Sequence, residues 1–262
     1  MEIDSTLKPG LAAISGGLGD IGRVIAIALA RAGSDIAIGD IKSEKEATAL
    51  SEEIHVLGRR CFYAPLDVSN PERVSVWYDE VSHHFGFSPN LIVSNAATVT
   101  LKSHLNVSSD EWSREININL NGSFFFTNAG VKRLLKKTQP GRVVFIGSWA
   151  AHAPHRELPA YSVAKAGQRM LMKTLALEVA SNGILVNEVA PGYVDAGLSA
   201  DIFKKNPELA DKAKATVPIK KLITPDEVAG QVLFLCSAYA SQMTGTTLLQ
   251  DGGLSLLQGD RS

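Results

Sequence analysis

The feature that most constrains the fold of this chain is a regular alternation of short β-branched runs with longer amphipathic segments. The pattern begins with a run at residues 11–15, an amphipathic segment at 20–32 and a second run at 35–40. That order predicts a βαβ unit, in which a helix joins two parallel strands. Between further helical patterns, strand-like runs recur at 60–64, 91–94, 142–147, 184–190 and 246–249. The sequence therefore predicts an α/β fold, a doubly wound parallel sheet of about seven strands flanked by helices on both faces.

The organisation of the 262 residues indicates a single domain over 1–262, because no repeat, low-complexity tract or Pro/Gly/Ser-rich linker divides the chain. Doubly wound sheets routinely exceed the average domain size. The least regular stretch, 192–218, follows a predicted strand and contains a helical segment at 199–215. Since loops beyond the strand ends cover the ligand crevice of such sheets, we predict that 192–218 forms a substrate lid.

Composition excludes several classes of partner. The formal net charge is -1, with Lys and Arg spread along the chain, so we expect a small-molecule partner, no nucleic acid and no membrane surface. The first ten residues carry two acidic side chains and no apolar stretch, and no run approaches the roughly 18 apolar residues that span a bilayer. A cytoplasmic location is therefore expected. Cys61 and Cys236 have no Cys or His partner at ligand spacing, which argues against a disulfide framework and a metal site and favours core positions.

A glycine-rich turn lies between the first predicted strand and helix. Glycines allow close approach of a phosphate to the backbone, and the unpaired N–H groups of the helix N-terminus attract it. The turn alone is weak, because glycine turns also serve as plain connections. It gains weight from Asp40, which ends the second strand eighteen residues after Gly22, where a carboxylate binds ribose hydroxyls. The pattern predicts a Rossmann-like dinucleotide site formed by Ser15, Gly16, Gly19, Asp20, Ile21, Gly22, Asp40 and Ile41.

Asp40 also bears on the choice of cofactor. A carboxylate at this place would repel a 2'-phosphate, so the sequence favours NAD, with NADP as the alternative. Lys42 and Arg23 lie close by in the sequence and would soften that preference.

A second group of residues carries proton chemistry. A strand leads to Ser148, and a long helix from about 161 to 181 carries Tyr161 and Lys165, which share one face because they are four apart. An ammonium beside a phenol favours the phenolate, so we expect the pKa of Tyr161 to fall from about 10 toward neutrality. The plainer interpretations are a surface pair on an amphipathic helix and a serine that caps the end of a strand.

These motifs together resemble the short single-domain branch of the short-chain dehydrogenase/reductase family. The resemblance rests on Tyr161-x-x-x-Lys165, on Ser148 thirteen positions upstream and on the glycine turn. It covers nearly the whole chain, since family landmarks follow in order at Leu66-Asp67-Val68, Ser94-Asn95-Ala96-Ala97, Asn119, Pro191-Gly192 and Asp251-Gly252-Gly253.

The resemblance implies an oxidoreductase with a catalytic set of four residues. Ser148 would steady the substrate oxygen, Tyr161 would exchange a proton with it, and Lys165 would tune Tyr161 and bind the nicotinamide ribose. Asn119 would hold a water that links Lys165 to solvent. Further implied cofactor contacts are Asp67, Val68, Asn95, Ala96, Tyr161, Lys165, Pro191, Gly192 and Val194. A homotetramer or homodimer is also implied. The apolar positions Met170, Leu171, Leu175 and Leu177 of the long helix would suit a subunit interface, although packing in the core explains the same periodicity.

Four positions depart from the family pattern. Ser94 replaces the first asparagine of its landmark, which we expect to alter packing more than chemistry. Asp20 stands where the family turn has its second glycine, and we expect it to cap the helix and face outward. Ala97 replaces a common glycine, which we expect to alter packing more than chemistry. Ala196 replaces a threonine that contacts the nicotinamide carboxamide, which puts that contact in doubt.

The substrate pocket is expected to involve Ser148, Trp149, His155, Tyr161 and Tyr193. Its histidine suits a polyhydroxylated substrate, although loop histidines are more often simply solvated. The favoured function is interconversion of a secondary alcohol, a sugar or polyol among the candidates, with its ketone. One alternative is an NADPH-dependent reductase of 3-oxoacyl thioesters. Another is a nonenzymatic dinucleotide-binding sensor or interaction module.

Overall fold

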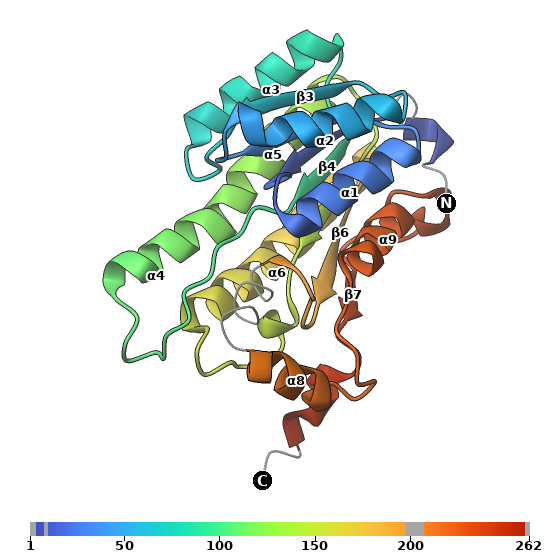
Figure 1. The fold of residues 1–262 in the computed structure, drawn as a ribbon. Coiled ribbons are helices and arrows are strands. Elements are labelled where there is room, and N and C mark those ends of the chain that lie inside the picture. Colours follow the sequence, from blue (N-terminus) through green and yellow to red (C-terminus); the bar gives the residue numbers. More distant parts are fainter. Residues whose placement is uncertain (1–3, 8–9, 198–206, 260–262) are drawn as a thin grey trace.

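The computed structural model of the chain describes residues 4–7, 10–197 and 207–259. Its centre is a twisted β-sheet (Figure 1). The sheet has seven strands in the order β3-β2-β1-β4-β5-β6-β7, and every neighbouring pair is parallel. The strands are β1 Leu11–Ser15, β2 Asp35–Asp40, β3 Cys61–Pro65, β4 Leu91–Ser94, β5 Gly141–Ile146, β6 Ile184–Pro191 and β7 Thr247–Gln250. The predicted fold class is confirmed, and no strand end differs from its predicted position by more than one residue.

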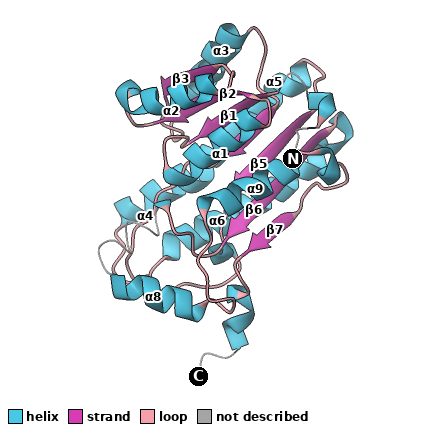
Figure 2. Ribbon diagram, turned by 45° about the vertical axis from the view of Figure 1, so that its right-hand side comes forward, coloured by secondary structure: helices cyan, strands magenta, loops and turns pink. Residues whose placement is uncertain are grey.

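Helices cover both faces of the sheet (Figure 2). One apolar cluster packs α1 Asp20–Arg31, α2 Glu44–Val56 and α9 Pro225–Leu235 against one face. A second cluster packs α3 Pro71–Phe85, α5 Gly122–Lys136 and α6 Pro159–Val179 against the other. Two further α-helices in the described part of the chain are α4 Ser109–Ile116, which contacts α6, and α8 Pro207–Thr216. Within the described residues, no helix is both long and apolar enough to cross a membrane.

The order of the strands fixes where a ligand can bind. β1 pairs with β2 on one side and with β4 on the other, so the connections that leave β1 and β4 run to opposite faces of the sheet. Open α/β sheets bind ligands in the crevice beyond the carboxyl ends of the strands at such a switch point. The glycine-rich turn after β1 and Asn95 after β4 both lie at this place.

The segment predicted to be a lid is described only in part. Residues 198–206, which include the first half of the expected helix, lie outside the described residues, whereas its second half forms α8. α8 lies beyond the carboxyl ends of β6 and β7 (Figure 1). Val217, just after α8, packs with Trp149, Ala153 and Leu254.

Candidate active site

A cavity of about 550 Å³ lies at the carboxyl ends of the strands. Its volume is within the range of ligand pockets, about 300–1,000 Å³. The predicted site residues that line it are Gly16, Gly19, Asp20, Ile21, Gly22, Asp40, Ile41, Asp67, Val68, Asn95, Ala96, Ser148, Tyr161, Lys165, Pro191, Gly192 and Val194. Both groups of residues that the sequence singled out, the glycine turn and the Tyr161 helix, therefore border one cavity.

The glycine turn is built so that nothing but hydrogen fits at its key positions. Gly16 has a φ of +65°, and a Cβ added there would lie 2.7 Å from the Cα of Ala96. A Cβ at Gly22 would lie 2.2 Å from the carbonyl oxygen of Gly16. Asn95 fastens the turn, because its Nδ2 donates to the carbonyl oxygens of Ser15 and Gly16 at 3.2 and 2.9 Å. A tight backbone cradle at a helix N-terminus fits the phosphates of a dinucleotide.

Ser15 supports this cradle from behind. Its Oγ accepts hydrogen bonds from the backbone N–H groups of Asn95 and Ala96, at 3.1 and 3.2 Å. Ser15 is buried and is not among the residues that line the cavity. In this structure it holds the β1 and β4 ends together, and its predicted role as a cofactor contact stays a prediction.

Asp20 differs from its predicted role as a helix cap. The N-cap of α1 is Gly19, and Asp20 is the first residue of the helix. Its side chain is exposed and its Oδ2 accepts a hydrogen bond from the backbone N–H of Gly197, 2.8 Å away. The capping prediction was wrong because Gly19 already has the extended conformation that an N-cap needs, with φ -75° and ψ 162°.

The carboxylate of Asp40 lies against the turn. Its Oδ2 accepts from the backbone N–H of Leu18 at 2.9 Å, and its Oδ1 accepts from that of Lys42 at 3.1 Å. The ammonium of Lys42 in turn donates to the carbonyl oxygen of Leu18 at 3.1 Å. Ile41, between them, is 79% exposed and offers an apolar surface at the cavity rim. This end of the cavity fits an adenosine ribose.

Tyr161 and Lys165 lie on α6, which begins at Pro159 rather than at 161 because proline is well suited to the first turn of a helix. The ammonium of Lys165 donates to the carbonyl oxygen of Ile146 at 2.7 Å and to Oε1 of Gln168 at 3.1 Å. Burial lowers the pKa of Lys165 to about 8, and the Glu188 carboxylate partly opposes that shift.

The predicted fall in the pKa of Tyr161 is wrong for this structure. Burial raises the pKa of Tyr161 to about 12; a hydrogen bond with Ser148 opposes the rise and the charge of Glu115 adds to it. Lys165 does not reverse this because its ammonium is directed to Ile146 and Gln168 and lies 5.6 Å from the centre of the Tyr161 ring. Tyr161 is therefore a protonated phenol at neutral pH.

Asn119 is fully buried in a π-helical stretch, Asn117–Asn121, between α4 and α5. Its side-chain amide makes two bonds of 2.8 Å with the backbone N–H and carbonyl of Thr98 in the loop after β4. Its own carbonyl oxygen accepts from Oγ of Ser123 at 2.8 Å and from Nε2 of Gln168 at 3.4 Å. Gln168 thus joins Asn119 to Lys165, and the predicted water-holding role of Asn119 stays a prediction.

The substrate end is assembled around Ser148. Its Oγ accepts from the backbone N–H of Ala150 at 3.1 Å, so it caps the short helix that follows β5 as well as lining the cavity. Trp149, His155 and Tyr193 do not line the cavity among the described residues. They form an aromatic cluster beside it, with the Trp149 ring 5.9 Å from His155 and 5.5 Å from Tyr193. Their predicted direct contact with substrate stays a prediction. Ala196 does line the cavity, but its methyl group cannot donate a hydrogen bond.

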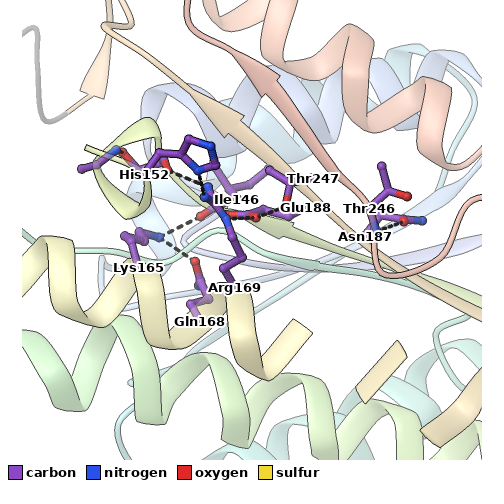
Figure 3. A network of polar contacts seen from close by, with 11 residues as sticks. Ile146, His152, Lys165, Gln168, Arg169, Asn187, Glu188, Thr246 and Thr247 are labelled. Carbon is purple, nitrogen blue, oxygen red and sulfur yellow. Dashed lines mark hydrogen bonds and ion pairs between the residues drawn. The ribbon is translucent and has the colours of Figure 1, made fainter. Parts of the chain in front are cut away.

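Several residues of the site were missed by sequence reasoning. Arg114 and Thr98 line the cavity, while Gln168, Arg169 and Glu188 lie in the polar network behind it (Figure 3). Two of them carried a usable signal. Arg169 follows Lys165 by four residues, so it lies on the same helix face. Glu188 is a charged residue in β6, a strand of mostly apolar residues, and a buried charge there requires a partner.

The arrangement can bind a dinucleotide along the glycine turn and present a phenol, a serine hydroxyl and an ammonium at the other end of the cavity. Such a set can hold a carbonyl or hydroxyl oxygen and exchange one proton with it.

Comparison with known proteins agrees with this geometry. A family model described as "Enoyl-(Acyl carrier protein) reductase" matches residues 17–255. The short-chain dehydrogenase/reductase eriH of Hericium erinaceus is 33% identical over 248 residues, which cover 93% of this chain and 97% of the relative. An L-rhamnose-1-dehydrogenase of Scheffersomyces stipitis is 31% identical over 92% of this chain and 94% of the relative. The 3-oxoacyl-[acyl-carrier-protein] reductase FabG of Aquifex aeolicus is 32% identical over 97% of this chain and 100% of the relative.

Solved structures share the fold over nearly the full length. The crystal structure of gox2181 has a TM-score of 0.89 and 32% identity, covering 97% of each chain. A putative 2-deoxy-D-gluconate 3-dehydrogenase from Agrobacterium tumefaciens, solved with bound NADP, has a TM-score of 0.85 and 26% identity, again covering 97% of each chain.

Proposed function

The chain belongs to the short-chain dehydrogenase/reductase family, and from that premise we propose that it interconverts a secondary alcohol and its ketone with NAD as the preferred cofactor. The observation that carries the proposal is one cavity with two chemically distinct ends. The glycine turn and Asp40 border one end, and Ser148, Tyr161 and Lys165 border the other.

The proposed mechanism divides the chemistry between cofactor and chain. A bound nicotinamide would exchange the hydride, and the protein supplies alignment and the proton. In the direction of reduction, Ser148 holds the ketone oxygen and Tyr161 donates its phenolic proton to it. A pKa of about 12 keeps Tyr161 protonated at neutral pH, so it is ready for that direction. Oxidation is the reverse transfer.

Lys165 is proposed to anchor the nicotinamide end. An ammonium has three donors, and two of them are used by Ile146 and Gln168. The third remains for a ribose hydroxyl of the cofactor. Because Lys165 is held at the base of the cavity, it also places positive charge near the phenolate that Tyr161 becomes after it gives up its proton.

NAD is proposed over NADP because of Asp40. Its buried carboxylate is held at the cavity edge by Leu18 and Lys42, where it would accept bonds from ribose hydroxyls and repel a 2'-phosphate. Lys42 stands beside it as a feature of this edge that favours NADP, and the Agrobacterium relative was solved with NADP.

The proposed substrate class is a sugar or polyol, which the similarity to an L-rhamnose-1-dehydrogenase supports. The second candidate is a 3-oxoacyl thioester, supported by the similarity to FabG.

A homodimer or homotetramer is part of the proposal, since Met170 and Leu177 on α6 are exposed apolar side chains. Light scattering tests the oligomer. The single-domain organisation, with 192–218 over the substrate end, also remains a proposal.

The decisive experiment is a cofactor-coupled screen of sugars including L-rhamnose, other secondary alcohols and ketones, and a 3-oxoacyl thioester, with a Tyr161→Phe variant alongside. We expect Tyr161→Phe to lower turnover by roughly 10²–10⁴-fold and to retain NADH binding. Tyr239→Phe is the matched control, since Tyr239 is 82% exposed on the surface. Turnover unaffected by Tyr161→Phe would overturn the mechanism. NADH binding without turnover of any compound would favour a nonenzymatic binding module.

A further inference from the structure

One face of α6 carries three functional groups at intervals of four residues, Tyr161, Lys165 and Arg169. The first two border the cavity, whereas Arg169 lies behind it at the ends of the central strands (Figure 3). The proposed reaction uses Tyr161 and Lys165 and leaves the role of Arg169 unexplained.

The guanidinium of Arg169 contacts three parts of the chain. Its Nε donates to Oε2 of Glu188 at 2.7 Å, and its Nη2 donates to the carbonyl oxygen of Ser148 at 3.0 Å and to Oε1 of Glu188 at 3.3 Å. Its Nη1 lies 2.6 Å from Nδ1 of His152. Since a guanidinium only donates, Nδ1 of His152 is the acceptor in this contact. Arg169 therefore holds both Ser148 and the turn that follows it.

Glu188 completes the network across the sheet. Its side chain is fully buried on β6, and its Oε2 also accepts from Oγ1 of Thr247 on β7 at 2.6 Å. Gly147 leaves room for it, because a Cβ at Gly147 would lie 1.8 Å from Oε1 of Glu188. Gly147 directly precedes Ser148, so the carboxylate packs against the backbone that carries the predicted catalytic serine.

A gain in folding stability does not by itself explain why Arg169 and Glu188 form a buried ion pair. Removing two charges from water is expensive, and replacing a buried ion pair by apolar residues of similar volume is often neutral or stabilising. An ion pair whose donors are all hydrogen-bonded in one arrangement, however, fixes the position of the groups that it contacts. Here those groups are the carbonyl of Ser148 and the backbone on either side of it.

We propose that Arg169 and Glu188 are positioning residues, which hold Ser148 in register with Tyr161 and place a carboxylate behind Lys165. This inference rests on the proposed function for its catalytic consequence. The positional part is a property of the chain alone: α6 is tied to β5 through Lys165 and Ile146, to the Ser148 turn and β6 through Arg169, and to β7 through Glu188 and Thr247.

The charge of Glu188 affects the pH at which Lys165 titrates. It favours the ammonium form of Lys165 and so raises the pKa of that lysine against the effect of burial. Among the described residues, the other titratable or charged groups around this part of the site include Tyr161 and Arg169 on α6, His152 after the Ser148 turn, and Arg114 and Glu115 on α4. Removal of the Glu188 charge alone should move the titration of Lys165 to lower pH.

The test compares conservative variants of two buried ion pairs. Glu188→Gln and Arg169→Lys change the proposed positioning pair. Asp4→Asn and Arg142→Lys change a matched pair, joined at 2.6 Å, whose arginine lies at the opposite end of β5. We expect the first two variants to fold, to bind NADH nearly as the parent does, and to lose roughly 10²-fold in kcat with a smaller change in KM. The control variants are expected to keep kcat even if their Tm falls.

A second measurement needs no substrate. The ¹⁵Nζ resonance of Lys165, assigned with Lys165→Arg, is titrated by NMR in the parent, Glu188→Gln and Asp4→Asn. A midpoint that falls in Glu188→Gln and stays in Asp4→Asn supports the proposal. Unchanged kcat in Glu188→Gln and Arg169→Lys, together with an unchanged midpoint in Glu188→Gln, would overturn it, whatever the Tm of the two variants. If no variant, the parent included, turns over any substrate, the proposed function fails, and the NMR titration still decides whether Glu188 acts on Lys165.

Discussion

The carboxylate of Asp20 and the backbone N–H of Gly197 are joined by a 2.8 Å hydrogen bond between residues 177 positions apart. The bond links the first turn of α1, where a cofactor phosphate is expected, to the segment that leaves β6 toward the substrate end. Both residues line the cavity. The acidic residue at the glycine turn is therefore directed toward Gly197.

Two variants separate the charge of Asp20 from its hydrogen bond. Asp20→Asn keeps an acceptor oxygen, and because an exposed charge is well screened, we expect the Kd for NADH to change by less than about threefold. Asp20→Ala removes the bond, worth about 0.5–1.5 kcal/mol, so amide exchange in 192–197 should accelerate by roughly threefold to tenfold. Fluorescence titration and hydrogen-exchange mass spectrometry measure the two effects. Markedly tighter NADH binding by Asp20→Asn would show that the carboxylate repels the cofactor after all.

The glycine cradle predicts a sharp difference between two Gly→Ala changes. At Gly22 the new Cβ would lie 2.2 Å from a backbone oxygen, which cannot move away without deforming the turn. We expect Gly22→Ala to weaken NADH binding by at least about tenfold, or 1.4 kcal/mol. At Gly230 in α9 a Cβ meets nothing within 4 Å, so Gly230→Ala should bind NADH normally and gain about 0.5–1 kcal/mol of stability. Equal NADH affinity in both variants would contradict the cradle.

The fold was predictable because its signals are local. The β1–α1–β2 unit follows from hydrophobic periodicity and from glycines at 16, 19 and 22, and the parallel order follows from strands that alternate with helices. Tyr161 and Lys165 were placed on one helix face by spacing alone. These inferences need no knowledge of what packs against each element.

The features of the site that the sequence did not predict depend on tertiary packing. The direction of the Tyr161 pKa shift is set by burial, and burial is not visible in a four-residue spacing. Arg169 meets Glu188 only because α6 packs on β6. Trp149 was expected to face the substrate but is 4% exposed within an aromatic cluster. In each case the missing information is which side chain fills the space next to the motif.

The carboxylate of Asp40 predicts the ratio of cofactor efficiencies. Asp40→Asn keeps the size of the side chain and removes the charge that would face a 2'-phosphate. We expect the ratio of kcat/KM for NADH over NADPH to fall by at least about tenfold, because a like charge held against the phosphate is worth several kcal/mol. Steady-state kinetics with both cofactors measure it. Asp226→Asn, on α9 and outside the cavity lining, is the control. A parent enzyme that prefers NADPH would contradict the assignment of NAD.

The buried Lys165 predicts how stability depends on pH. Its pKa is about 8 in the folded chain, against an ordinary value of 10.5 for a lysine in water. Between these values the unfolded chain binds a proton that the folded chain has released, so the contribution of Lys165 to the free energy of unfolding rises with pH. The whole rise amounts to about 3 kcal/mol. Relative to Lys165→Met, the parent should therefore gain stability from about pH 8 upward.

Denaturant unfolding of both proteins between about pH 7 and pH 10 measures this difference. Tyr161 and the two cysteines have raised pKa values, but they are present in both proteins, so their titration largely cancels in the comparison. Lys173→Met is the matched control, because Lys173 lies on the same helix and is exposed. Its difference from the parent should stay flat across the range. A flat difference for Lys165→Met as well would mean that the ammonium is not desolvated in the folded chain, and the proposed place of Lys165 at the base of the cavity would have to be abandoned.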